Sequence, residues 1–425
     1  MKIIFLNRFF YPDHSATSQM LSDLAFALSE RRHTVEVITS RLSYDKRDLL
    51  KRRESVRGVT ITRVTTTRFG RDHLLGRAID YASFYATAFF SLMLRAERGT
   101  IIVAKTDPPM LSLLTLPVCA FKGAISINWL QDIFPEIAEV LGFSQGRIQK
   151  TAIFLLRLLR NISLKRAHLN VVLGEGMAAK LRTLGVPQSA ISIIPNWASG
   201  TLIHPVDSKN NTLRKVWGLE GSFVVGYSGN LGRAHEIETF LASIEELEKR
   251  EAVVPALEGA TAEASTGAQP IQWLFIGGGA QMEVLKREVK RRELTSVMFK
   301  PYQPRALLSE SLSVPDVHLI SLRRELEGLI VPSKFYGIAA AGRPAIFVGH
   351  PDGELATIIK KHSIGFVACD GAQSLSRAIL ALTDSPDLAA RQGARARQLF
   401  ETEFDFPRVL ASWEKALENA WRAQS

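Results

Sequence analysis

Residues 2–39 read KIIFLNRFFYPDHSATSQMLSDLAFALSERRHTVEVIT and contain two short apolar runs on either side of an amphipathic segment. The runs Lys2–Leu6 and Val35–Thr39 have the length and composition of buried strands. Between them, residues 17–32 carry apolar side chains at helical spacing, which predicts a helix with one apolar face. Because a helical crossover between neighbouring strands makes them parallel, this stretch predicts a βαβ unit.

The same alternation continues along the chain and is interrupted by a polar stretch that ends near Leu219. Further strands are expected at residues 59–64, 100–104, 125–130, 169–173, 223–227, 271–276, 316–321, 344–348 and 365–368. Repeated strand–helix alternation favours a parallel sheet with helices on both faces. We therefore predict an α/β protein with two doubly wound domains facing each other across a cleft. The expected boundaries are 1–200 for the first domain, 201–221 for a linker, 222–407 for the second domain, and 408–425 for a terminal helix that packs back on the first.

The composition excludes several classes of protein. Of the 425 residues, 46% are hydrophobic and 22% are charged, so the chain can bury enough apolar surface to avoid wholesale disorder. The two cysteines, Cys119 and Cys369, exclude a disulfide scaffold, and neither belongs to a CxxC pair that would favour a thiolate metal site. The opening run MKIIFLNR is interrupted by Asn7 and Arg8 and is not expected to be a signal peptide.

The positive charge is concentrated in the first half of the chain. Residues 1–200 contain 27 basic and 15 acidic residues, whereas the remaining residues contain 26 and 27. A one-sided basic field suits an anionic partner: nucleic acid, a phosphorylated substrate or an anionic membrane surface. The alternative is a basic face that is only solvated.

Residues 148–166, IQKTAIFLLRLLRNISLKR, alternate aliphatic clusters with basic residues. This pattern is typical of a helix that lies on an anionic bilayer. It is equally typical of a helix that buries its apolar face in the core and exposes a basic face, and the sequence leaves both open. Residues 78–94 are too short for a spanning helix and contain Asp80, so a spanning protein is not expected.

Two glycine-bearing turns follow successive strands of the predicted second domain. Gly229 and Gly232 would let the backbone approach a ligand, and the next helix would offer its N–H groups to a phosphate near Arg233. Gly277–Gly279 repeats this device after the next strand. The alternative is a pair of tight turns without a ligand. Neither turn is a GxGxxG fingerprint, and no GxxxxGK[ST] motif occurs, which disfavours a P-loop hydrolase.

Residues 324–342, RELEGLIVPSKFYGIAAAG, are the most informative segment. Pro332 favours the start of a helix, where the Ser333 hydroxyl and the Lys334 ammonium would form a seat for a diphosphate. Glu354 follows the next strand, where a carboxylate can accept hydrogen bonds from a ribose diol. The alternative is a helix cap with an acidic neighbour.

Polar residues also follow strands of the first domain. Asp132 and Glu136, in WLQDIFPE, lie where a cleft-facing acid would be useful. The loop after the first strand carries polar groups that can receive an acceptor: Asp13, His14, Ser15, Thr17 and Ser18. Lone acids and a lone histidine are also common at surfaces and caps.

The order of the segments FYPDHSATS, WLQDIFPE, IIPNW, VVGYSGNLG, FIGGG, KPYQPR and EGLIVPSKFYGIAAAGRP resembles bacterial family-4 glycosyltransferases of the GT-B fold. The similarity is greatest to those that build O-antigen, capsule or colanic acid. It implies transfer of a sugar from a nucleotide-sugar with retention of configuration. The donor would bind mainly the second domain and the acceptor the first. It also implies a metal-independent enzyme without cofactors, because basic side chains and a helix dipole replace Mg²⁺.

By position, the resemblance implies catalytic roles for Asp132, Glu327 and Lys334. Glu327 resembles the first glutamate of a paired-glutamate motif that contacts the donor sugar. The implied donor-binding residues are Gly229, Asn230, Gly232, Arg233, Gly277, Gly278, Gly279, Pro301, Tyr302, Gly328, Leu329, Ile330, Pro332, Ser333, Lys334 and Glu354. Pro301 and Tyr302 would lie beside the nucleobase.

The chain also departs from the family pattern. Gly337 stands where many relatives have a ribose-binding glutamate, for which Glu354 is the expected substitute. Asn230 replaces a usual arginine, which leaves Arg233 in its place. Asp132 lies at or near a position where many relatives carry a histidine.

These features predict a hexosyl- or N-acetylhexosaminyl-transferase that uses a UDP-sugar and a polyprenyl-diphosphate-linked saccharide. We expect it in the cytoplasm, peripheral on the inner face of the cytoplasmic membrane, with no nucleic-acid partner. The alternatives are a nucleotide-sugar 2-epimerase of the GT-B fold, a basic nucleic-acid-binding protein, or an inactive sugar-binding relative. Incubation with a nucleotide-sugar alone separates the epimerase from the transferase, and a salt-dependent gel shift tests nucleic-acid binding.

Overall fold

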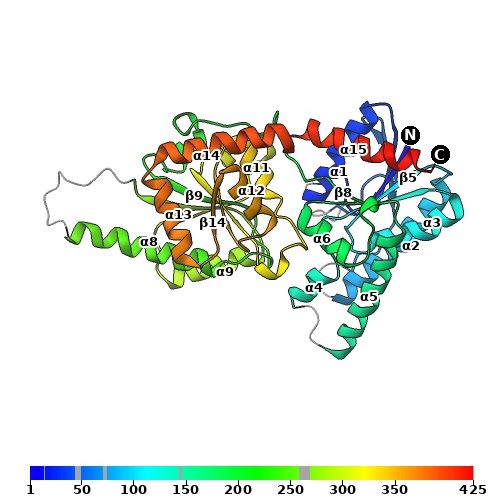
Figure 1. Cartoon of the computed structure of the whole chain (residues 1–425), viewed down its shortest axis with the longest axis horizontal. Coiled ribbons are helices and arrows are strands. Elements are labelled where there is room, and N and C mark those ends of the chain that lie inside the picture. Colours follow the sequence, from blue (N-terminus) through cyan, green and yellow to red (C-terminus); the bar gives the residue numbers. More distant parts are fainter. Residues whose placement is uncertain (14, 44–48, 70–73, 143–145, 258–268, 425) are drawn as a thin grey trace. The chain divides into compact units, whose positions relative to one another are not determined.

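The computed structural model describes residues 1–13, 15–43, 49–69, 74–142, 146–257 and 269–424 (Figure 1). The chain divides into two compact units. Unit 1 comprises Met1–Pro195, Gly328–Ile330 and Val409–Ser425, and unit 2 comprises Asn196–Glu327 and Val331–Arg408.

The described part of unit 1 contains an eight-stranded sheet of order β3-β4-β2-β1-β5-β6-β7-β8. Its strands are β1 (Lys2–Leu6), β2 (Thr34–Ser40), β3 (Arg53–Val56), β4 (Val59–Val64), β5 (Ile101–Lys105), β6 (Ile125–Trp129), β7 (Leu169–Val172) and β8 (Ile191–Ile193). All neighbours are parallel except β3 and β4. The predicted βαβ unit is confirmed, because α1 (Ala16–Glu30) joins β1 to β2 and Ile3 pairs with Val35.

Besides α1, further helices of unit 1 pack around this sheet. They are α2 (Leu74–Arg95), α3 (Thr115–Lys122), α4 (Glu136–Val140), α5 (Arg147–Arg166), α6 (Glu175–Thr183) and most of α15 (Phe406–Arg422). Phe84 and Leu92 of α2 pack on Ile4 and Ile102 of the sheet. Trp413 of α15 packs edge-on against Trp129, with ring centroids 4.7 Å apart.

The described part of unit 2 contains a six-stranded parallel sheet of order β11-β10-β9-β12-β13-β14. Its strands are β9 (Phe223–Asn230), β10 (Ile271–Gly278), β11 (Val297–Lys300), β12 (Val317–Ser321), β13 (Ala345–Val348) and β14 (Gly365–Ala368). Its helices are α7 (Thr212–Val216), α8 (Glu238–Leu257), α9 (Ala280–Arg291), α10 (Leu308–Ser313), α11 (Lys334–Ala340), α12 (Glu354–His362), α13 (Ala372–Thr383) and α14 (Pro386–Leu399). Successive residues Val224 and Val225 belong to two different apolar clusters, so both faces of the sheet are covered. Two doubly wound sheets confirm the predicted fold class.

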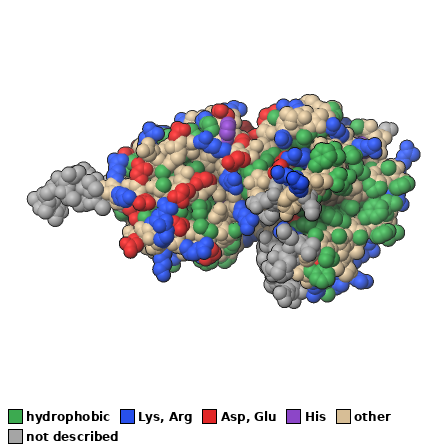
Figure 2. Space-filling model, turned by 90° about the horizontal axis from the view of Figure 1, so that it is seen from below, with side chains coloured by type: hydrophobic (Ala, Val, Ile, Leu, Met, Phe, Trp, Pro, Cys, Tyr) green, Lys and Arg blue, Asp and Glu red, His purple; other side chains and the backbone are tan. Residues whose placement is uncertain are grey.

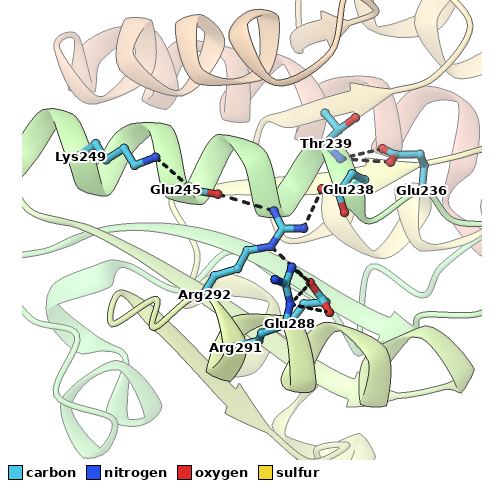
Figure 3. A network of polar contacts seen from close by, with 8 residues as sticks. All are labelled: Glu236, Glu238, Thr239, Glu245, Lys249, Glu288, Arg291 and Arg292. Carbon is cyan, nitrogen blue, oxygen red and sulfur yellow. Dashed lines mark hydrogen bonds and ion pairs between the residues drawn. The ribbon is translucent and has the colours of Figure 1, made fainter.

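An ion-pair network joins α8 to α9 on one face of unit 2 (Figure 3). The Arg292 guanidinium lies 2.7 Å from the Glu238 carboxylate, 3.4 Å from that of Glu288 and 3.7 Å from that of Glu245. Arg291 also bonds Glu288, at 2.6 Å. Exposed pairs of this kind contribute about 0–1 kcal/mol each, so the network adds little to the stability of unit 2 and has no evident chemical role.

Each sheet has a point where its strand order reverses. In unit 1 this point lies between β1 and β5, and in unit 2 between β9 and β12. The connections leave the two central strands toward opposite faces there, which opens a crevice at the carboxyl ends of the strands. Ligand-binding side chains are therefore expected at both crevices.

Candidate functional site

Lys334, the first residue of α11, lies at the reversal point of unit 2. Its Nζ donates a hydrogen bond to the Tyr227 hydroxyl at 2.7 Å and lies 3.2 Å from His235 Nε2. Tyr227 belongs to β9, and His235 Nδ1 lies 2.6 Å from the carbonyl oxygen of Ser321, the last residue of β12. Because a carbonyl only accepts, Nδ1 carries the proton and Nε2 is free to accept from Lys334.

The Lys334 ammonium is held by neutral groups. Burial, and secondarily the Lys334 charge, lower the pKa of His235 to about 3, so the imidazole is neutral at physiological pH. Burial also lowers the pKa of Lys334 to about 7. Across the described residues, Lys334 forms no ion pair with a carboxylate. A partly buried cation without a counter-charge, in a strand-end crevice, is suited to an anionic ligand.

The turns at Gly229 and Gly277, beside Lys334, are so close to neighbouring atoms that a side chain would occupy the remaining space. Gly229 has φ +124°, and a Cβ there would lie 3.7 Å from Lys334 Cε. A Cβ on Gly277 would lie 2.3 Å from the Gly229 carbonyl oxygen. The Tyr302 ring lies against Gly277 and Gly278, 3.1 and 3.2 Å from the positions their Cβ atoms would take, and Tyr302 is 60% exposed. An exposed ring on a glycine platform offers a stacking surface for a planar base.

The other predicted donor residues of unit 2 differ in their exposure and in their contacts. Arg233 is exposed in the turn after β9. Ser333 is exposed directly before α11, and Pro332, which precedes it, is buried. The Glu327 carboxylate accepts a hydrogen bond from the Glu354 backbone N–H at 2.8 Å, so it caps the start of α12. The backbone of Glu354, the residue predicted to bind the ribose, therefore holds the Glu327 carboxylate in place.

Three further predicted donor residues, Gly328–Ile330, are grouped with unit 1. There the Leu329 carbonyl accepts from the Ile133 N–H at 2.9 Å, and Ile330 forms an antiparallel bridge with Asp132. The short segment therefore touches the residue predicted as the catalytic acid. Sequence reasoning placed these residues with the donor and did not anticipate this pairing.

The reversal point of unit 1 also holds a buried lysine. Lys105 ends β5, and its Nζ donates to the Thr17 carbonyl at 2.9 Å and lies 3.9 Å from the centre of the Trp129 ring. The Thr17 hydroxyl donates to Asp107 Oδ2 at 3.4 Å. Burial lowers the pKa of Lys105 to about 7, against the opposing charges of Asp107 and Asp23. The crevice therefore combines a cation, a carboxylate and a hydroxyl.

Asp132 follows β6 and lines the same cavity as Lys105 and Thr106. Its Oδ1 is buried and has no hydrogen-bond partner in the described part of the chain. Burial, with a smaller contribution from Asp107, raises the pKa of Asp132 to about 7. A carboxyl group with a pKa near neutrality can take a proton from an attacking hydroxyl.

The remaining residues predicted in the first domain stabilise local structure. Glu136 forms a buried bidentate pair with Arg160, with N–O distances of 2.9 and 2.6 Å. Ser15 caps α1, since its side chain accepts from the Ser18 N–H at 3.3 Å, and the buried Ser18 hydroxyl donates to the Asp13 carbonyl at 3.2 Å. His14 lies outside the described residues.

Sequence reasoning missed Tyr227 and His235 in unit 2, and Lys105 and Asp107 in unit 1. Lys105 and Asp107 stand at the carboxyl end of a predicted strand, a signal that was available. Tyr227 also ends a predicted strand, but neither it nor His235 carries a local signal of its contact with Lys334, which is about a hundred residues away in the sequence.

Comparisons with known proteins identify glycosyltransferases as relatives of this chain. Residues 16–197 match the Glycosyl transferase 4-like domain. The chain is 27% identical over 304 residues to WbjE of Pseudomonas aeruginosa, named as a glycosyltransferase, covering 70% of each chain. It is 21% identical over 432 residues to WcaI of Escherichia coli (strain K12), named as a colanic acid biosynthesis glycosyl transferase, covering 96% of this chain and 98% of WcaI.

Solved structures share the fold over nearly the full length. Sucrose-phosphate synthase of Thermosynechococcus elongatus superposes with a TM-score of 0.76 at 16% identity, covering 100% of both chains. HepE of Anabaena in complex with UDP gives 0.71 at 14% identity, covering 99% of this chain and 100% of HepE. WaaG, a glycosyltransferase involved in lipopolysaccharide biosynthesis, gives 0.70 at 13% identity, covering 98% and 99%. Within the described ranges, no helix is both long and apolar enough to cross a membrane.

Proposed function

Because this chain is a family-4 glycosyltransferase with the GT-B fold, we propose that it transfers a sugar from a UDP-sugar to a polyprenyl-diphosphate-linked saccharide during synthesis of a bacterial surface polysaccharide. The observation that carries the donor half is the uncompensated Lys334 ammonium at the reversal point of unit 2. The UDP and UDP-glucose complexes of HepE support a uridine nucleotide. The names of WbjE and WcaI support the polysaccharide.

The diphosphate would sit on Lys334 and the Gly229–Gly232 turn. Lys334 supplies a positive charge, Arg233 a second one, and Ser333 a hydroxyl donor. The uracil would stack on the Tyr302 ring beside Gly277. Preorganised donors at a developing charge contribute about 3 kcal/mol each to the rate, which would let the enzyme work without a divalent cation. Turnover unaffected by EDTA is the expected result.

The reaction would then proceed with retention. The bond between the sugar's anomeric carbon and the UDP oxygen loosens, and its electron pair leaves with UDP. An acceptor hydroxyl attacks the same face of the oxocarbenium-like sugar and forms the new glycosidic bond. The hydroxyl proton passes to Asp132, whose Oδ1 has no hydrogen-bond partner among the described residues and whose pKa is near neutrality. Lys105 and the Thr17 hydroxyl would help to bind the acceptor.

The location follows from the acceptor. A polyprenyl-diphosphate-linked saccharide is held in the membrane, so the enzyme would work in the cytoplasm at the inner membrane face. The net charge of residues 1–200, with 27 basic and 15 acidic residues, supports attraction to the acceptor diphosphate and to anionic lipids. The same charge would hold the protein near the membrane surface.

Thermal unfolding with a panel of nucleotides and nucleotide-sugars tests the donor. A ligand that binds only the folded state raises the melting temperature, and we expect UDP and one UDP-sugar to do so. The variant Lys334→Met should lose this shift and keep its own melting temperature without ligand near that of the parent. Equal shifts in both proteins would remove Lys334 from the site.

Transfer is tested by adding the stabilising UDP-sugar to membranes that contain polyprenyl-linked acceptors. We expect UDP release and a labelled lipid product with the donor's anomeric configuration, both dependent on the acceptor. An epimerised UDP-sugar formed without acceptor would instead indicate the epimerase. Salt-dependent retardation of DNA or RNA without UDP binding would indicate the nucleic-acid-binding alternative.

A further inference from the structure

Helix α5 is turned so that most of its large apolar side chains face outward. Its buried positions include Ile153, Ser163 and the charged Arg160, which is 6% exposed and paired with Glu136. Five large apolar side chains of the same helix are 45–59% exposed: Phe154, Leu155, Leu158, Leu159 and Ile162. The alternative in which this helix buries its apolar face in the core is therefore wrong for these residues.

Helix α2 presents a second apolar stripe. The described side chains that are exposed on this helix stand at positions 78, 79, 82, 86, 90 and 94, and all of them are apolar. Phe90 is 66% exposed and Leu94 is 83% exposed. These positions recur every three to four residues, so they share one side of the helix. An exposed stripe without a single charge is unusual for a helix that meets only water.

Both stripes belong to one region of unit 1. Helices α2, α3 and α5 all contact the short 3-10 helix Leu111–Leu114, and α3 adds Phe121, which is 78% exposed. Figure 2 shows hydrophobic side chains gathered on the surface of unit 1. We call this surface the outer helical face and define it by Ile79, Phe90, Leu94, Phe121, Phe154, Leu155, Leu158, Leu159 and Ile162.

Exposed cations flank the apolar side chains of α5. Arg147 and Lys150 are exposed at its start, and Lys165 and Arg166 are exposed at its end. The twenty residues of α5 contain no acidic residue. An apolar centre with cations at both ends matches the profile of a lipid bilayer edge, where acyl chains accept the apolar side chains and phosphate headgroups accept the cations.

We propose that the outer helical face docks unit 1 on an anionic phospholipid bilayer, with its apolar side chains inserted at the boundary between headgroups and acyl chains. A second copy of the chain is a poorer occupant, because like-charged helices would be brought together. The inference deepens the proposed membrane location. Its test measures binding alone, without donor or acceptor.

The experiment measures co-sedimentation of the full chain with vesicles of phosphatidylcholine containing phosphatidylglycerol, and with vesicles of phosphatidylcholine alone. The protein should bind the anionic vesicles and lose most of this binding at high salt. The double variant Leu155→Glu/Leu159→Glu should bind at least tenfold more weakly, because two carboxylates would enter the apolar boundary. Phe90→Glu, on the other stripe, should also weaken binding.

Matched controls separate docking from folding. Val216→Glu changes an equally apolar residue that is 78% exposed on α7 of unit 2, and should bind vesicles like the parent. Lys165→Ser/Arg166→Ser should weaken binding to anionic vesicles by about fivefold per cation removed and leave binding to neutral vesicles unchanged. All variants should keep the parent's melting temperature, since the substituted side chains are exposed.

Three results would overturn the inference. The first is that the parent protein does not co-sediment with anionic vesicles. The second is unchanged binding in Leu155→Glu/Leu159→Glu and Phe90→Glu. The third is that light scattering shows the parent protein to be a dimer and the substituted variants to be monomers. The outer helical face would then be an interface between two copies of the chain. Vesicle binding without a UDP-dependent thermal shift would support the membrane-docking proposal and contradict the donor proposal. A UDP-dependent thermal shift without vesicle binding would support the donor proposal and contradict membrane docking.

Discussion

The Lys334 ammonium should give UDP binding a pH dependence near neutrality. Burial lowers the pKa of Lys334 to about 7, and its hydrogen-bonding partners, the Tyr227 hydroxyl and the His235 ring, supply no negative charge. A diphosphate binds the protonated lysine better than the neutral one. Raising the pH above 7 therefore removes the charge that the ligand needs, and the affinity for UDP should fall.

The size of the effect follows from the pKa. If only the ammonium form binds, the competent fraction is about one half at about pH 7 and about one thirtieth at about pH 8.5. The dissociation constant of UDP should therefore rise about fifteenfold over this interval, equivalent to about 1.6 kcal/mol. The terminal phosphate has a pKa of about 6 and is mostly ionised throughout, so the ligand contributes little to the change.

Isothermal titration calorimetry of the full chain with UDP measures this dependence directly. Lys334→Arg keeps a charge at every pH used and should flatten the curve, whereas Lys334→Met should bind UDP weakly throughout. His235 stays neutral over the interval because burial lowers its pKa to about 3. A parent curve without slope would refute the reasoning. So would a full slope in Lys334→Arg, which would assign the titration to Lys105 or Asp132, whose pKa values are also about 7.

Three further variants test other parts of the two units. Tyr227→Phe removes one acceptor of the lysine and should weaken UDP binding about fivefold in the same calorimetric assay; a change below about twofold would contradict the contact's role. Asp132→Asn should lower the rate of acceptor-dependent UDP release by about 10²–10⁴-fold and leave UDP affinity unchanged, whereas parental turnover would exclude it as the proton acceptor. Glu136→Gln should lower the free energy of unfolding in urea by about 3 kcal/mol, because it leaves the buried Arg160 without a charged partner. Its control, Glu175→Gln, breaks an exposed pair and should change that free energy by less than about 1 kcal/mol.

The fold was predictable because its signals are local. Strand-length apolar runs, such as Lys2–Leu6 and Phe223–Tyr227, and the helical spacing between such runs can be read within short windows. The crossover rule then makes the strands parallel without knowledge of the rest of the chain. The reversal points were not readable in this way, because strand order depends on which sides the distant crossovers take.

In the candidate site, too, local features were predictable from the sequence and contacts between distant segments were not. Lys334 was predicted from its own segment, in which proline, serine and lysine follow a strand and an apolar loop. That its ammonium meets Tyr227 and His235 depends on β9 lying beside β12, which only the assembled sheet provides. Glu327 was also predicted from its own segment, as a carboxylate at the donor sugar. Its hydrogen bond to the start of α12 was not predicted, because that contact too depends on the tertiary structure.

The sequence by itself determined that this chain alternates strands and helices in two doubly wound sheets, and that residues 148–166 form an amphipathic basic helix. Only the tertiary structure decided which side of that helix faces inward. Helical periodicity fixes the angle between side chains, not the direction of the core. Here Arg160 turns inward because the buried Glu136 compensates its charge, and Leu158 on the opposite side is left at the surface.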